Sequence, residues 1–346
     1  MRPGDGSHVT VALAWGAVDR LLVRDLSEEA LLRRIVPVLP RGRLTLIAAG
    51  DDAAVVNAPD GRVVVTTDVL VENQHFRREW SSGMDVGRRA AVQNLADVAS
   101  MGARPTALVV ALVMPGDLPV EWAVGLAEGL AAECAPLGIG VVGGDLSGGP
   151  LVVVSVTAHG DLEGRAPVLR SGARAGDVVA HAGVRGWSAA GLELLLAGRG
   201  AVDEGLVAAY LRPTSPLVAG PAAASAGATS MIDVSDGLLR DAGRVGRASG
   251  VVIDLDRAED VFAADLERLA AAEAALGTPA RTWVLGGGED HGLLATFPPG
   301  LQLPAPFRAV GHVRAVPHGG RAGVLVAGAE PDVALGWDHF AGKDAG

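Results

Sequence analysis

Aspartates stand where several apolar strands of this sequence meet glycines or other small residues. The pattern occurs in the stretches GDDAAVV, TTDVLV, NLADVASMG, GGDLSGG and MIDVSDG. Carboxylates that face one cleft supply the oxygen ligands that Mg²⁺ prefers, and glycines let backbone N–H groups approach phosphate oxygens. We therefore expect a site for hard cations and phosphates. Its candidate ligands are Asp51, Asp68, Asp97, Asp145 and Asp233, with Thr66 and Thr67 adding oxygens beside Asp68.

Each of these motifs, taken alone, also has a purely structural interpretation. A Gly-Asp-Asp is usually a turn, and Ser235 or Asp236 could simply cap a helix. The familiar phosphate-binding loop, the protein-kinase catalytic loop and zinc-type histidine spacings are all absent from the sequence. The combination of several acidic motifs predicts the cation site, but spacing alone does not name the reaction.

The elements that must position these residues follow from hydrophobic periodicity and breakers. We expect strands at 62–71, 104–115, 139–145, 150–160, 178–183, 229–234, 291–298, 307–313 and 323–328. Helices are expected at 24–39, 85–102, 119–138, 187–198, 204–227 and 236–248. The turn-rich stretch 161–177 separates two such groups, so we predict an extension at 1–23, a domain at 24–160 and a second domain at 161–346.

Bulk composition limits the class of protein. Of the 346 residues 49% are hydrophobic but only 3% are aromatic, which is typical of α/β domains with Val, Leu and Ala cores. A net charge of −11 argues against a nucleic-acid surface, and the apolar run 9–15 is too short to span a membrane. The single cysteine, Cys134, rules out an internal disulfide framework and is expected in the core. We expect a cytoplasmic protein.

Taken together, the motifs resemble those of the thiamine-monophosphate kinases, in the superfamily that includes aminoimidazole ribonucleotide synthetase. The resemblance rests on GDDAAVV, TTDVLVENQHF, QNLADVASMGARP, GGD, RSGARAGD, DVSDGL, GGGEDH and GWDHF, and it runs from about residue 24 to 340. It implies an aminoimidazole ribonucleotide synthetase-like fold of two α/β (α+β) domains, with the N-terminal sheets paired across a homodimer. It also implies phosphoryl transfer from ATP to thiamine monophosphate, assisted by several Mg²⁺ ions.

The same resemblance assigns roles to residues. The metal ligands would be Asp51, Thr66, Thr67, Asp68, Asp97, Asp145 and Asp233, with Asp236 on an outer ion. Gly144, Asp145, Arg170 and Ser235 match ATP-contacting positions, and His75, Glu289 and Trp337 match the thiamine pocket. Because the acceptor is an anionic phosphate oxygen, no catalytic base or nucleophile is expected among the protein side chains.

Four positions depart from the family pattern, and two rival interpretations stay open. Asn73 and Gly148 replace a frequent glycine and arginine, while Trp187 and Gly292 stand where acidic residues are common. The rivals are another ATP-dependent member of the superfamily, such as aminoimidazole ribonucleotide synthetase, and a non-catalytic nucleotide-binding relative. The intact aspartates favour an active kinase.

Overall fold

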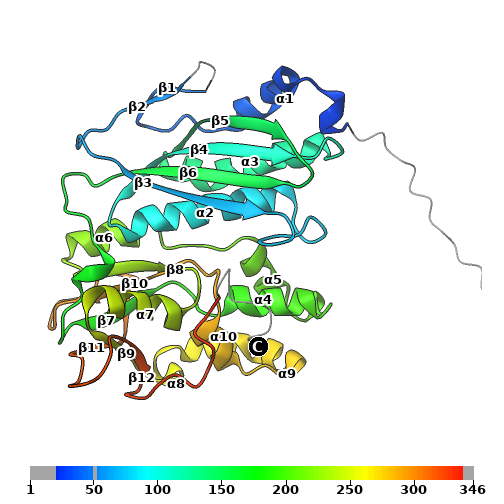
Figure 1. Cartoon of the computed structure of the whole chain (residues 1–346). Helices are drawn as coiled ribbons and strands as arrows, with labels where there is room; N and C mark the ends of the chain where they lie inside the picture. The colour runs from blue at the N-terminus through cyan, green and yellow to red at the C-terminus, as the bar shows by residue number, and fades with distance from the viewer. Residues whose placement is uncertain (1–20, 50–52, 338–346) are drawn as a thin grey trace, which may run out of the picture.

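The structure is a computed structural model that describes residues 21–49 and 53–337. Two large sheets with helices packed on them form the molecule, one above the other (Figure 1). The N-terminal strands are β1 (Thr45–Ile47), β2 (Val55–Val56), β3 (Val64–Val71), β4 (Arg104–Met114), β5 (Gly140–Gly148) and β6 (Val153–Asp161). Their helices are α1 (Glu28–Ile35), α2 (Gly83–Ser100) and α3 (Val120–Cys134).

The C-terminal half contains the second sheet. Its strands are β7 (Val178–Ala182), β8 (Ser230–Val234), β9 (Val252–Leu255), β10 (Gly292–Phe297), β11 (Arg308–Arg314) and β12 (Gly323–Val326). Its helices are α4 (Trp187–Leu196), α5 (Glu204–Leu211), α6 (Ala219–Ser225), α7 (Leu238–Ser249), α8 (Ala258–Val261), α9 (Ala263–Leu276) and α10 (Ala280–Gly286). The predicted division at residue 160 falls at the end of β6, ahead of the first strand of this sheet.

Both sheets are mainly antiparallel. The first has the order β3-β6-β4-β5 and the second β12-β9-β11-β7-β10-β8, with parallel pairing only between β4 and β5 and between β9 and β12 among these strands. Helices α2 and α3 cover one face of the first sheet, where the largely aliphatic core lies. The glycines at 87 and 129 let these helices touch, since a Cβ at Gly87 would lie 2.1 Å from the Leu126 carbonyl oxygen.

Helix α2 is the element that joins the two halves. It lies between the first sheet and strands β8 and β10 of the second (Figure 1). It begins with a capping box in which Ser82 and Asp85 satisfy each other's backbone N–H groups. Because it is packed on several sides, thirteen of its residues are buried, including Arg89, Asn94 and Ser100. Polar side chains on this helix therefore face protein rather than solvent.

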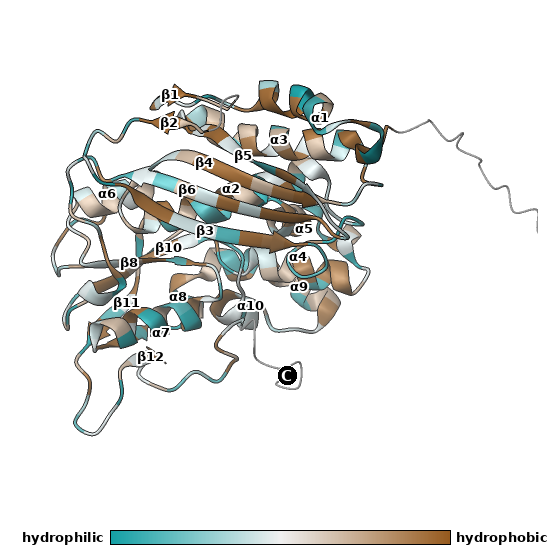
Figure 2. Ribbon diagram, turned by 45° about the horizontal axis from the view of Figure 1, so that its top comes forward, coloured by the Kyte–Doolittle hydropathy of each residue, from teal (hydrophilic) through white to brown (hydrophobic). Residues whose placement is uncertain are grey.

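No helix within residues 21–49 and 53–337 covers the outer face of the first sheet. Figure 2 shows the strands in front of their helices, with long apolar stretches along them. Val65 and Val69 of β3 point to this face and are 61% and 42% exposed. Among the described residues, no helix is long and apolar enough to cross a membrane.

Two expectations for the chain's course need correction. The helix expected at 204–227 is two helices, α5 and α6, because Pro213 and Pro216 interrupt it. The residues expected to end the extension belong partly to the first domain, since Val23 N donates to the Leu118 carbonyl and Val120 N donates to the Leu21 carbonyl. The expected strands were otherwise found close to their predicted places, whereas β1, β2, β9, α8, α9 and α10 had not been expected.

Candidate active site

Three of the predicted metal ligands meet where β3 passes over α2. Thr66 and Asp68 project from the same face of β3, because side chains alternate along a strand. The Thr66 hydroxyl donates to Asp97 Oδ2 at 2.9 Å, and Asn94 Oδ1 accepts the Asp68 backbone N–H at 3.1 Å. Asn94 is itself held by a hydrogen bond from its amide to the Ala90 carbonyl. The strand and the helix thus bring Asp68 and Asp97 to one place.

Asp233 joins these two carboxylates from the second sheet. It is buried near the end of β8 and is paired with Leu293 of β10. Strand β8 is the edge strand of the second sheet, and it contacts α2. Burial, followed by the charges of Asp233 and Asp68, raises the pKa of Asp97 to about 7. The pKa of Asp68 is also raised, chiefly by burial and by Asp233, although a hydrogen bond with Gln93 opposes this. Three carboxyl groups therefore share a site with too little positive charge to balance them. We call Asp68, Asp97 and Asp233 the acid cluster.

The loop before β10 adds a carboxylate and an imidazole. His291 Nδ1 lies 3.8 Å from Asp233 Oδ2, and its Nε2 lies 3.5 Å from Glu289 Oε2. Burial disfavours the imidazolium, but these two carboxylates outweigh it and raise the pKa of His291 to about 10. Arg89 of α2 contacts the same Glu289 oxygen at 2.5 Å. Burial opposes ionisation of Glu289, yet Arg89 and His291 lower its pKa to about 2.

Asp290, the middle residue of this loop, has a different role. Its carboxylate is completely buried and accepts the backbone N–H groups of Gly186 at 2.6 Å and Ser188 at 2.8 Å, at the beginning of α4. It also lies 3.3 Å from Arg185 Nη1. Burial raises its pKa, while Arg185 opposes that rise. Asp290 thus holds the helix, and its neighbours Glu289 and His291 face the acid cluster.

Ser235, Asp236 and Trp337 lie at the same edge of the second domain. The Ser235 carbonyl accepts the Glu289 N–H at 2.7 Å, and the Asp236 carbonyl accepts the Trp337 N–H at 2.9 Å. The Asp236 carboxylate pairs with Arg244 Nη2 at 2.7 Å, so part of its charge is already balanced. Trp337 is 61% exposed and is therefore not part of the core of the second domain.

His75 lies in the tight turn that follows β3. Its Nδ1 accepts the Val71 N–H at 3.0 Å, and its carbonyl accepts the Tyr210 hydroxyl at 3.3 Å. The charge of His75 contributes to the lowered pKa of Glu289, which places the two side chains in one electrostatic environment. Asn73 in this turn has φ 68°, a conformation that asparagine tolerates better than most residues. The departure from glycine at this position is therefore compatible with the turn.

Gly144 and Asp145 are not brought to the acid cluster within one protomer. They lie on β5, which β6 and β4 separate from β3, and Asp145 stands opposite Ala111 on the exposed face. The Ser147 hydroxyl donates to Asp145 Oδ2 at 2.8 Å. Thr67 also points to the exposed face, pairing with Thr157, while Thr66 and Asp68 point to α2. The predicted metal ligands are thus divided between two faces of the sheet.

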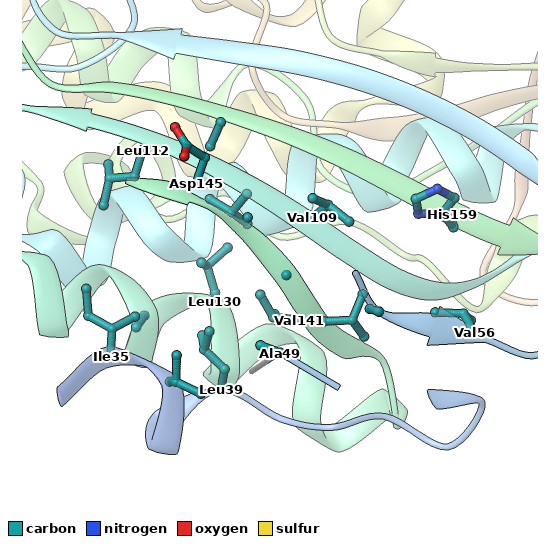
Figure 3. Close-up of a pocket in the computed structure, with 18 of the residues that line it drawn as sticks. Ile35, Leu39, Ala49, Val56, Val109, Leu112, Leu130, Val141, Asp145 and His159 are labelled. Atoms are coloured by element: carbon teal, nitrogen blue, oxygen red, sulfur yellow. The ribbon is translucent and has the colours of Figure 1, made fainter. Parts of the chain in front are cut away.

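A large cavity lies beside Asp145. It has a volume of about 1450 Å³ and runs between β4, β5 and the segments around α1 and β2 (Figure 3). Leu112, Leu130 and Val141 give it apolar walls, and Asp145 and His159 stand at its border. Gly144 borders it too, and there only glycine fits, since a Cβ would lie 1.9 Å from the Val110 carbonyl oxygen. The cavity is large enough for a nucleotide-sized ligand.

Arg170 is not brought to the acid cluster. Arg170 lies in a short 3-10 turn, where its carbonyl accepts the hydroxyls of Ser230 at 3.1 Å and Ser249 at 2.8 Å. Ser230 begins β8 whereas Ser235 follows its end, so Arg170 and Ser235 stand at opposite ends of this strand. Asp51 lies outside the described residues.

Sequence reasoning missed Arg89, Tyr210 and His291. An arginine inside the otherwise small and apolar run GRRAAVQNL was a signal for Arg89, because an unpaired charge is rarely buried. Within residues 21–49 and 53–337, no three side chains of His, Cys, Asp or Glu are arranged as a ready-made metal site.

The sequence is similar to those of known proteins along most of its length. Residues 50–162 match the family model of AIR synthase related protein, N-terminal domain. The chain is 47% identical to the thiamine-monophosphate kinase of Mycobacterium tuberculosis (strain ATCC 25618 / H37Rv) over 95% of this chain and 96% of the relative. It is 42% identical to the thiamine-monophosphate kinase of Corynebacterium glutamicum over 84% of this chain and 88% of the relative.

Solved structures show the same fold. The thiamine monophosphate kinase from Aquifex aeolicus superposes with a TM-score of 0.71 at 32% identity, covering 79% of this chain and 90% of that one. AaThiL complexed with AMPPCP and TMP superposes with a TM-score of 0.73 at 32% identity, covering 85% of this chain and 92% of that one. The hydrogenase maturation protein HypE shares the fold alone. It is 18% identical and superposes with a TM-score of 0.68, covering 92% of this chain and 99% of that one. With these relatives matched along nearly its whole length, the chain belongs to the thiamine-monophosphate kinase family.

Proposed function

We propose that this protein transfers the γ-phosphoryl group of ATP to thiamine monophosphate and releases thiamine diphosphate and ADP. The observation that carries the proposal is the acid cluster between the two domains, with Glu289, His75 and Trp337 beside it. Family membership supports it, as does the relative solved with AMPPCP and TMP, a ligand pair that fits a kinase of this substrate.

The acid cluster is suited to Mg²⁺. Asp68 and Asp97 have raised pKa values because carboxylates crowd there, and a bound cation would remove that repulsion. We propose that Asp68, Asp97 and Asp233 hold Mg²⁺ together with Thr66 and phosphate oxygens. When bound, Mg²⁺ supplies the charge neutralisation that allows two anionic phosphate groups to approach. Asp236, which shares its charge with Arg244, is the candidate ligand of an outer ion.

The side chains around the cluster orient the acceptor. Glu289 is ionised across the physiological pH range because its pKa is about 2, so it can meet a cationic or N–H-bearing group of thiamine. The exposed Trp337 can offer its ring to the thiazolium cation. The acceptor oxygen of thiamine monophosphate is already anionic, so transfer requires in-line alignment rather than a protein base.

We further propose that the protein acts as a homodimer. Asp145, Thr67 and the exposed valines lie on one uncovered sheet face, and a symmetric partner would bury them. ATP would then bind near this junction, with Gly144 and Asp145 on the side of the large cavity. Arg170 and Ser235 are retained as ATP contacts, and the working location is proposed to be the cytoplasm.

A direct assay tests the function. Purified protein with ATP, Mg²⁺ and thiamine monophosphate should form ADP and thiamine diphosphate in equal amounts, detected by chromatography. ADP formation with the formylated amidine precursor of aminoimidazole ribonucleotide, but not with thiamine monophosphate, would instead identify a cyclase of the superfamily. No ADP with either substrate, despite measurable ATP binding, would identify a non-catalytic relative.

A further inference from the structure

Arg89 is a deeply buried charged residue beside the acid cluster, being only 2% exposed. It belongs to α2 of the first domain, yet its contacts belong to the second. Nη2 donates to Glu289 Oε2 at 2.5 Å, and Nη1 donates to the Tyr210 carbonyl at 2.9 Å. The guanidinium carbon lies 4.7 Å from the centroid of the Tyr210 ring. Three elements that are distant in the chain are thus tied together by one side chain.

Stability alone is a weak reason for this arrangement. Burying a guanidinium is costly, and a buried ion pair is often no more stabilising than apolar residues of the same size. The neighbouring residues Ala90 and Ala91 are also buried, so an apolar side chain would suit the surroundings of position 89. Arg88 provides a contrast within the same sequence, since it turns the other way and pairs with Glu133 of α3 at 2.6 Å.

Glu289 needs an external support because its own backbone gives little. It follows the three glycines 286–288 and has φ 70°, a conformation that is rare for residues with a side chain. Arg89 and His291 both contact Oε2 of its carboxylate. The side chain is 35% exposed, and no described residue forms a hydrogen bond or ion pair with Oε1. Arg89 fixes one oxygen, which leaves the other for a ligand.

We propose that Arg89 is a positioning residue for substrate recognition. It holds Glu289 from across the domain junction, so that Oε1 is presented to an N–H or cationic group of the thiamine moiety. The inference rests on the proposed function, in which Glu289 contacts thiamine monophosphate. It makes recognition of the acceptor depend on how the first domain sits against the second, because the arginine and the glutamate belong to different domains.

The test compares two adjacent arginines. Arg89→Lys keeps the charge but loses the planar, two-pronged contact, and Arg88→Lys is the matched control. Arg89→Lys should raise KM for thiamine monophosphate by at least about tenfold, the scale of a lost charged hydrogen bond, with kcat and KM for ATP within about twofold of wild type. Arg88→Lys should leave all three constants near wild type. If the two variants give the same KM for thiamine monophosphate, the inference is overturned.

A double-mutant cycle shows whether Arg89 acts through Glu289. Glu289→Gln should raise the same KM, and adding Arg89→Lys to it should raise KM no further. Independent, multiplying effects would show that Arg89 does not act through Glu289. If Arg89→Lys fails to fold, as judged by circular dichroism, Tyr210→Leu removes the ring against the guanidinium and should raise this KM partway. An unchanged KM in that variant would also overturn the inference.

Failure of this inference can be distinguished from failure of the proposed function. A wild-type protein that forms no ADP with thiamine monophosphate contradicts the function itself. An active wild type in which Arg89→Lys behaves like Arg88→Lys contradicts only the positioning role.

Discussion

At the scale of single residues, neighbouring acids in this protein have opposite tasks. Glu289 and Asp290 are adjacent in the chain, but one faces the acid cluster and the other caps a helix in the domain interior. Their pKa values diverge accordingly, lowered for Glu289 by Arg89 and raised for Asp290 by burial. Gly292, two residues after Asp290, leaves room for His181, since a Cβ there would lie 2.7 Å from His181 Nε2. An acidic side chain at 292 would collide with this histidine.

Asp97→Asn tests the acid cluster. The variant should lower kcat by at least about 100-fold at saturating Mg²⁺, because a preorganised electrostatic contact to the transferring phosphoryl group is lost. The fold should remain, since the asparagine oxygen can still accept from Thr66. Exposed Asp117→Asn is the control, and both variants are compared by coupled ADP assay and circular dichroism. A near-normal rate for Asp97→Asn would contradict the ligand role.

Stability of the metal-free protein gives a second readout of Asp97. Its pKa rises from 3.8 to about 7, so the folded state favours the protonated group. The stability that this group contributes is therefore complete below about pH 4 and is lost as the pH rises through about 7. In EDTA, the melting temperature of the wild type should fall between pH 5 and 8 more steeply than that of Asp97→Asn. Equal slopes would mean that burial and the neighbouring carboxylates do not raise the pKa of Asp97.

At the scale of elements, the loop before β10 connects the site to α4. Asp290 takes the place of an N-cap residue for that helix, accepting two backbone N–H groups, although it is about a hundred residues away in the chain. The fully buried Arg185 completes the arrangement by donating to the carbonyls of Val284 and Gly287. The position of Glu289 is therefore linked to the packing of α4 and α10.

Asp290→Asn should destabilise the protein by about 3–5 kcal/mol, because it leaves the buried Arg185 charge without its partner. Asp203→Asn is the matched control. Asp203 caps α5 and pairs with Arg268 at a partly exposed site. Asparagine can still cap the helix, so only the ion pair is lost, at a cost of about 0–1 kcal/mol. Urea denaturation measures both free energies of unfolding. Equal losses in the two variants would show that burial of the Asp290 pair does not matter.

At the scale of the whole molecule, one uncovered surface stands out. The outer face of the first sheet presents Val65 and Val69 beside Thr67 and Ser155, without a covering helix (Figure 2). An uncovered apolar sheet face of this kind marks an interaction site or an aggregation risk. Asp145 lies on the same face, far from Asp97 within the protomer. A partner on this face would bring further groups to Asp145.

We expect the wild-type protein to be a dimer at micromolar concentration by light scattering. Val65→Asp with Val69→Asp should make it monomeric, because two charges would be buried against apolar surface. Val218→Asp is the control, since Val218 is 71% exposed on the second domain, and it should leave the dimer intact. A monomeric wild type, or a dimer that survives the double substitution, would contradict the proposed interface.

The sequence by itself determined much of the local structure and the family. Apolar periodicity predicted α1 and α2, and the β-branched run of β3 predicted that strand. The acidic motifs predicted a cation and phosphate site. The inferences about helices and strands succeeded because they depend on interactions within a few residues, which a sequence displays directly. The cation site stays a prediction.

Only the tertiary structure decided which of these residues meet. It showed that Asp68, Asp97 and Asp233 share one pocket of charge while Asp145 and Thr67 face away, because the faces of a strand alternate and α2 covers only one of them. It also paired Arg89 with Glu289 across 200 residues of chain. Spacing along a sequence cannot reveal such pairs, since they arise where α2 packs against the second sheet.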